Sequence, residues 1–193
     1  MFQGLYRSTM GLAGHRHAVA ALLALCAAEA SVFPVPADLL LIPVVLAQRD
    51  RAWRIAILCT FASVAGGLVG YGIGSFLFEA VGRPLLELYG YAERFADYQA
   101  RYNEWGFWIV VAGGLTPIPY KVVTIASGVA GQPLVTFVLA SLLSRALRYA
   151  AVTGLLWWFG PPVRAFVERR SGVATLLFLA VFVGGFVALG YLT

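Results

Sequence analysis

Charged residues are scarce in this chain. Only 12% of its 193 residues are Asp, Glu, Lys or Arg, whereas 61% are hydrophobic, and the mean hydropathy is +0.82. This composition lies far outside the range of soluble domains and indicates a polytopic membrane protein. At this length we expect one all-α membrane domain over residues 18–193.

Cysteine and histidine are also rare. Cys26 and Cys59 lie in apolar segments without the spacing of a disulfide or metal site, and we interpret them as small core residues. Both histidines lie in the N-terminal tail, so the membrane segments contain no Ser–His pair, and Ser127 lacks a base. We therefore expect no metal and no cofactor, and an enzyme is the less favoured interpretation.

The N-terminal residues 1–17 lack the long hydrophobic region and the cleavage site of a signal peptide. They contain Arg7 and Arg16 among scattered apolar residues, and we expect them to form an interfacial segment on the membrane surface. The net charge of +5 does not indicate a nucleic-acid partner, because the arginines lie mostly in loops between membrane segments.

The stretch GGLTPIPYKVVTIASGVAG, residues 113–131, is an apolar segment broken by Pro117 and Pro119. Proline removes a backbone donor and biases the preceding residue away from the helical conformation. The flanking arms of roughly ten residues reach ~16 Å each, about half of a ~30 Å hydrocarbon core. This predicts a re-entrant hairpin whose turn is buried in protein or faces water.

The same pattern occurs 83 residues earlier, in FPVPADLLLIPVVLA at 33–47. Pro34 and Pro36 align with the later prolines, and Asp38 aligns with Lys121, so the two copies carry opposite charges. A repeat of interrupted hydrophobic segments points to the binding site of a transporter, although a chance match of prolines and aliphatic residues is the alternative. We therefore predict a first hairpin, inverted relative to the second.

The remaining segments complete the layout. Ala62, Gly66, Gly70 and Gly74 recur every four residues along an uncharged stretch, which predicts a smooth helix face packed against a hairpin. The stretch at residues 79–104 has an aromatic face and a charged face, as in a helix anchored at the membrane interface. In order, we expect hairpin 1 at 18–47, a span at 55–78, an interfacial helix at 79–104, hairpin 2 at 105–131, and spans at 134–159 and 172–193.

Loop charges give the layout an orientation. Residues 1–17 carry two arginines and no acid, and residues 48–54 and 160–171 each carry three arginines and one acid, so each segment has a net charge of +2. Residues 79–104 carry three arginines and five acids, which gives −2. The positive-inside rule then places the N-terminus in the cytoplasm. Two thin full spans in place of each hairpin would give the same orientation.

Five ionisable residues lie inside the apolar segments: Glu29, Asp38, Lys121, Arg145 and Arg148. Each costs ~2.5–3.5 kcal/mol at mid-membrane, so such residues usually face a cavity and mark function. Asp38 begins a half-helix, where a carboxylate could equally be a structural cap. Lys121 begins the matching half-helix, where a cation is unfavourable because it opposes the helix dipole. A nearby anion would explain a lysine at this position, and the candidates are Asp38, Glu29 and a substrate phosphate.

Glu29 lies near the end of its half-helix, the unfavourable end for a negative charge. Burial and the dipole favour its protonated form and a nearby cation favours its charged form, so Glu29 is a candidate proton carrier. Arg145 and Arg148 lie on one face of their span, and either of them could pair with an acid. Two acids against three bases leave one positive charge for an anion.

The spacing of Glu29 and Asp38 around FPVP, the segment GLTPIPYK and the later SRALRY resemble the DedA family, also called the VTT or SNARE-associated Golgi protein domain. The sequence is most similar to the bacterial YqaA-like branch, over about residues 18–160. By this resemblance Glu29 and Asp38 match the essential acids of the family. Many members carry two arginines around the second hairpin's proline, where this chain has Gly114 and Lys121.

The resemblance implies two opposed re-entrant hairpins in a small helical bundle of the bacterial inner membrane. It implies a lipid translocase, a flippase or scramblase that moves a lipid such as polyprenyl phosphate or phospholipid, with proton dependence in some members. The partners would be anionic membrane lipids and protons, and a homo-oligomer is compatible with this. The alternatives are a membrane enzyme acting on lipids and a non-transporting assembly factor, although a scaffold needs no buried charges.

Overall fold

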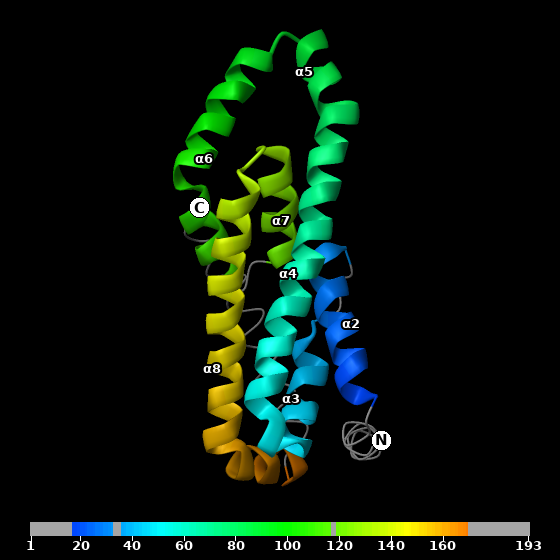
Figure 1. The fold of residues 1–193 in the computed structure, drawn as a ribbon, viewed down its shortest axis with the longest axis vertical. Helices are drawn as coiled ribbons and strands as arrows, with labels where there is room; N and C mark the ends of the chain where they lie inside the picture. The colour runs from blue at the N-terminus through cyan, green and yellow to red at the C-terminus, as the bar shows by residue number, and fades with distance from the viewer. Residues whose placement is uncertain (1–16, 33–35, 117–118, 170–193) are drawn as a thin grey trace.

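The computed structural model describes residues 17–32, 36–116 and 119–169, and every regular element in these ranges is a helix (Figure 1). The predicted surface segment, apart from His17, and the predicted span at 172–193 lie outside these residues. In chain order the elements are α2 (Ala18–Ser31), α3 (Asp38–Ala47), the 3₁₀ turn η1 (Arg49–Arg51), α4 (Ala52–Leu77), the π-helical turn η2 (Phe78–Gly82), α5 (Arg83–Leu88), α6 (Ala92–Leu115), α7 (Tyr120–Val129) and α8 (Leu134–Arg169).

Both proline motifs interrupt the helices, as the sequence predicts. Helix α2 ends at Ser31 and α3 begins at Asp38, while α6 ends at Leu115 and α7 begins at Tyr120. Pro34 and Pro117 themselves lie outside the described residues. In Figure 1 the α2–α3 pair opens towards the lower end of the molecule and the α6–α7 pair opens towards the upper end. Helices α2, α3 and α7 have 14, 10 and 10 residues, too short to cross a ~30 Å hydrocarbon core.

Two helical stretches, 49–88 and 134–160, are long and apolar enough to cross a membrane. The first continues as a helix from α4 through η2 and α5, beyond residue 78, where we expected the span to end. Its 40 residues reach ~60 Å, about twice the thickness of a hydrocarbon core. Its upper part, drawn beside the start of α6 in Figure 1, therefore extends beyond that core.

The polar stretch and the apolar arm that meet near residue 105 belong to one helix. Helix α6 is continuous over its 24 residues, from a polar start into the apolar arm that we had assigned to hairpin 2. A change from polar to apolar side chains does not break a helix, because no proline removes a backbone donor there. The chain instead turns just before α6, where Gly90 has a φ of 70° that glycine adopts without steric cost.

The predicted glycine face of α4 packs against both hairpins. A methyl group at Gly66 would overlap the carbonyl oxygen of Ala27 in α2, and one at Gly74 would overlap that of Ile125 in α7. A methyl group at Gly70 would meet Thr124 of α7 and, at 3.2 Å, the carbonyl oxygen of Ala30. Such close backbone approach is typical of small-residue helix interfaces in membranes. Helix α4 therefore lies between the two half-helices and holds them together.

An arginine that the sequence did not single out fixes the lower end of the bundle. Pro161 has no N–H, so the carbonyl oxygen of Trp157, four residues earlier, lacks its usual helical donor. The Arg49 guanidinium donates to that oxygen through Nη2. A Cβ at Gly160 would lie 3.1 Å from Cδ2 of Leu46, so the glycine allows α8 to pack closely against α3 at this point. In Figure 1 the last, orange part of α8 turns across the lower end of the molecule beyond this point.

The close contact at Gly66 predicts a sharp difference between two substitutions in α4. Gly66→Ala should destabilise the protein by about 1–3 kcal/mol, because the added methyl group must displace the backbone of α2. Gly72→Ala is the matched control, since nothing lies within 4 Å of a Cβ at that position. Thermal unfolding of the detergent-solubilised variants, followed by size-exclusion chromatography, measures the difference. Equal unfolding temperatures for the two variants would contradict this packing.

Candidate functional site

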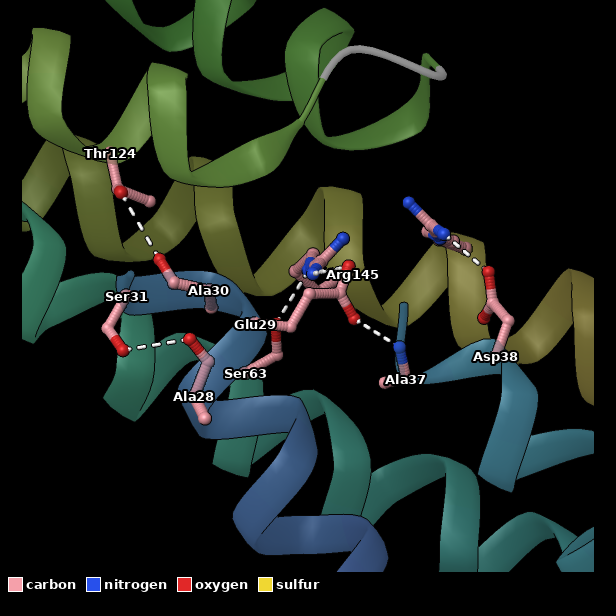
Figure 2. A network of polar contacts seen from close by, with 10 residues as sticks. Ala28, Glu29, Ala30, Ser31, Ala37, Asp38, Ser63, Thr124 and Arg145 are labelled. Carbon is pink, nitrogen blue, oxygen red and sulfur yellow. Dashed lines mark hydrogen bonds and ion pairs between the residues drawn. The ribbon is translucent and has the colours of Figure 1, made fainter. Parts of the chain in front are cut away.

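The structure gathers four of the five predicted charges into two acid–arginine pairs at the turn of hairpin 1 (Figure 2). Glu29 lies near the end of α2 and Asp38 is the first residue of α3, while Arg145 and Arg148 lie on the neighbouring helix α8. Lys121 is the second residue of α7. In the described part of the chain, no group of His, Cys, Asp and Glu could hold a metal ion.

Glu29 joins the two arms of its hairpin. Its Oε2 accepts a 2.8 Å hydrogen bond from the backbone N–H of Ala37, the N-cap residue of α3, and its Oε1 lies 4.0 Å from Nη2 of Arg145. The expectation that Glu29 occupies an unfavourable helix end therefore holds for α2 alone. Because the chain reverses at the proline motif, the carboxylate also faces the start of α3, where free backbone N–H groups favour a negative charge.

Arg145 is the most buried charge of the site, with 1% of its surface exposed. Its Nε donates a 2.7 Å hydrogen bond to the Ser63 hydroxyl of α4, and its guanidinium lies 4.2 Å from the ring centroid of Tyr120 in α7. The ring of Tyr149 lies on another side, at 5.5 Å. A buried guanidinium needs such hydrogen-bond and ring contacts to offset its lost hydration. Its Nη1 is buried without an acceptor among the described residues.

The second pair is shorter and more open to its surroundings. Nη2 of Arg148 donates a 2.7 Å hydrogen bond to Oδ2 of Asp38, and the two side chains are 25% and 24% exposed. Asp38 also begins α3, where the helix dipole favours its negative charge. The partner of Asp38 is thus Arg148, and Lys121, which we considered for that place, forms no ion pair with it.

Of the five predicted charges, Lys121 is the one that forms no ion pair with the described residues. It is half-buried, and its ammonium forms no ion pair or hydrogen bond with the described residues. Its backbone is well held, because the Thr124 hydroxyl donates to the Lys121 carbonyl oxygen at 2.9 Å and also lies 3.3 Å from the carbonyl oxygen of Ala30 (Figure 2). The start of hairpin 2's second arm is therefore attached to the end of α2, with its cation available to a ligand.

Four contributors to the site were not predicted as site residues from the sequence: Ser63, Tyr120, Tyr149 and the backbone of Ala37. Ser63 lies in a helix rich in small residues, where a serine does not indicate a site. The backbone N–H of Ala37 could not be recognised from the sequence, because it does not depend on the type of side chain. Tyr120 had a weak signal, because it lies directly before Lys121 in the PIPYK motif. Two nitrogen groups of the predicted site residues have no acceptor among the described residues, Nη1 of Arg145 and the Lys121 ammonium, and each can bind an anion.

Comparison with known proteins places Asp38, Lys121, Arg145 and Arg148 within a recognised domain, whereas Glu29 lies just before the matched residues. The family model described as "VTT domain" matches residues 35–158. An uncharacterised protein of Haemophilus influenzae is 34% identical over 169 residues, which are 88% of this chain and 88% of the relative. An uncharacterised protein of Histophilus somni is 36% identical over 160 residues, 83% of each chain. No solved structure matches.

The Asp38–Arg148 pair predicts a measurable coupling. In a double-mutant cycle with Asp38→Asn and Arg148→Gln, we expect the two side chains to stabilise each other by more than about 1 kcal/mol, because contacting groups in a partly buried pair are not additive. The exposed Glu79–Arg83 pair, also 2.7 Å apart, is the control and should show about 0.3–0.5 kcal/mol. Chemical denaturation in mild detergent gives both energies. Equal coupling in the two pairs would contradict a special role for the buried one.

Proposed function

The chain belongs to the VTT-domain family, also called the DedA family, and from this membership and its buried charges we propose that it moves lipids with an anionic headgroup across the membrane. The family and the apolar helices make it a helical membrane protein. The observation that carries the proposal is the unpaired Lys121 at the start of α7, next to Tyr120, whose ring lies against the Arg145 of an acid–arginine pair. Charges inside an apolar bundle are costly, and such charges usually mark the path of a substrate.

A lipid phosphate matches the groups that the site leaves free. The first turn of α7 offers backbone N–H groups and the ammonium of Lys121, and both attract an anion. The neighbouring residue, Tyr120, lies against Arg145, whose Nη1 has no acceptor among the described residues. A guanidinium nitrogen and an ammonium that meet at one phosphate would form charge-assisted hydrogen bonds. The lysine binds as a point charge rather than as a planar fork.

Competition for Arg145 would couple lipid binding to proton uptake. The Glu29–Arg145 contact is long, at 4.0 Å, so an arriving phosphate that approaches the guanidinium more closely would compete with Glu29 for it. A carboxylate that loses its cation inside an apolar bundle more readily takes up a proton. Linkage then requires that protonation of Glu29 and phosphate binding favour each other. Glu29 is thus proposed as the proton carrier.

The arrangement of the hairpins supports alternating access. We propose that both hairpins are re-entrant, with the turns of α2–α3 and α6–α7 inside the bilayer and their open ends on opposite sides, as Figure 1 orients them. The smooth glycine face of α4 would allow small movements of α2 and α7 past one another. We place the N-terminus in the cytoplasm of a bacterial cell and the protein in the inner membrane, in agreement with the loop charges.

The role of Lys121 can be tested directly. Lys121→Ala should abolish the movement of an anionic phospholipid, because the free cation of the site is lost, and Lys121→Arg should retain part of it. Transport is measured in proteoliposomes as the loss of protection of a fluorescent lipid from an impermeant quencher. Arg83→Ala is the control for lost charge, since Arg83 lies in the exposed pair with Glu79. A well-folded Lys121→Ala protein that transports normally would remove Lys121 from the site.

A further inference from the structure

An open cavity of about 470 Å³ lies between α6 and α7, apart from the acid–arginine pairs. Its walls are almost entirely carbon and are formed mainly by Phe95, Tyr98 and Tyr102 of α6 and by Val122, Ile125 and Ala126 of α7. Two polar groups at its edge are already engaged. The Tyr102 hydroxyl lies 3.0 Å from the Ser127 hydroxyl, and Gln99 donates to the Val129 carbonyl oxygen at 3.1 Å. The cavity therefore suits an apolar ligand.

A smaller, charged hollow adjoins this cavity. It has a volume of about 230 Å³ and is lined by Arg94, Asp97, Tyr98 and Arg101, so that Tyr98 forms part of both walls. Two arginines face one aspartate, which leaves the hollow with a net positive charge. Neither arginine forms an ion pair within the described part of the chain. Arg94 does lie 5.7 Å from the ring centroid of Tyr91, a contact that leaves its N–H donors available.

The two hollows lie where α6 changes character. Its residues before Trp105 include Glu93, Arg94, Asp97, Arg101 and Glu104, whereas residues 105–115 carry no charge. The helix thus passes from a polar into an apolar environment, and the exposed rings of Tyr98 and Trp105 are typical of the membrane interface. At that depth a lipid presents its charged headgroup and the start of its chains.

We propose that these hollows bind one membrane lipid with an anionic headgroup, its chain in the apolar cavity and its phosphate on Arg94 and Arg101. The pairing follows from the chemistry, because arginine binds phosphate oxygens in a fork and an aromatic–aliphatic cavity accepts a hydrocarbon chain. A neutral lipid would fill the cavity but leave the arginines without a partner. The site is distinct from the deep charges around Arg145.

Helix α7 connects this site to the proposed transport path. The cavity is lined by α7 from Val122 onwards, and Lys121 precedes Val122 directly. A lipid held here would already contact the half-helix that carries the unpaired cation, so the cavity would hold lipids before or after transfer. This connection rests on the proposed function, whereas binding at the cavity does not.

Photolabelling in nanodiscs tests the binding site. The probes are phosphatidylglycerol and phosphatidylcholine, each with a diazirine on one acyl chain and each present at the same mole fraction. Adducts are mapped by peptide mass spectrometry. In the wild type, phosphatidylglycerol should label residues 122–130 more than the exposed residues of α8, which are Leu134, Val135, Leu139, Leu143 and Leu147. In the combined Arg94→Gln and Arg101→Gln variant, labelling of residues 122–130 by phosphatidylglycerol should fall by about five-fold for each arginine, so that the preference for these residues over α8 is lost.

Three control variants separate the site from general contact with lipid. Ala126→Trp fills the cavity and should reduce labelling of α7 by both probes. Leu139→Trp adds the same bulk at an exposed position of α8, and Arg83→Gln removes one positive charge from an ion pair at the same end of the molecule. Both should label as the wild type does. Circular dichroism and size-exclusion chromatography confirm that each variant is folded.

Equal labelling of the α6–α7 cavity and of α8, or labelling that is indifferent to Ala126→Trp, would overturn the proposal. So would a photoreactive amino acid at Val122 that crosslinks to a second copy of the chain, since the cavity would then be a subunit interface. Because the readout is labelling rather than transport, this result is independent of the proposed function. If the wild type moves no lipid in proteoliposomes while the cavity is still labelled, the proposed function fails and the lipid site stands.

Discussion

The contacts of one buried arginine hold the centre of this protein together. Arg145 of α8 lies against Glu29 of α2, Ser63 of α4 and Tyr120 of α7, so one guanidinium touches both hairpins and the helix between them. Loss of one partner from a buried ion pair costs about 3–5 kcal/mol, because the remaining charge is left without water. A positive charge at this depth therefore fixes how the half-helices meet.

The rest of the bundle follows from keeping polar groups satisfied in apolar surroundings. Each half-helix ends inside the molecule, where backbone groups lose their helical partners. Side chains from the opposite arm or hairpin supply the missing partners. The Glu29 carboxylate accepts a hydrogen bond from the start of α3, and the Thr124 hydroxyl lies within hydrogen-bond reach of the end of α2. The glycine face of α4 brings these ends close enough for such contacts. The same contacts leave Lys121 unpaired, which gives the proposed anion site its charge.

Local rules predicted much of this architecture from the sequence. The helix breaks follow from proline chemistry, the packing face of α4 from glycine spacing, and the five deep charges from their cost in an apolar segment. The pairing of these charges did not follow, because Asp38 and Arg148 are 110 positions apart and their contact depends on how α3 and α8 are rotated. That the interfacial stretch and the first arm of hairpin 2 form one continuous helix was not predicted, because side-chain polarity changes near residue 105 while the backbone remains helical. That the hairpins are re-entrant and that the protein moves lipids stay predictions.

The central claim is that headgroup binding and the charge of Glu29 compete for one guanidinium. The direct measurement is anionic lipid movement in proteoliposomes, with and without a pH gradient, for the wild type and Glu29→Gln. Glu79→Gln serves as a control, because Glu79 belongs to an exposed pair. The account predicts that the wild type and Glu79→Gln respond to the gradient, while Glu29→Gln still binds lipid but no longer responds. A Glu29→Gln protein that accelerates under the gradient as the wild type does would contradict the account.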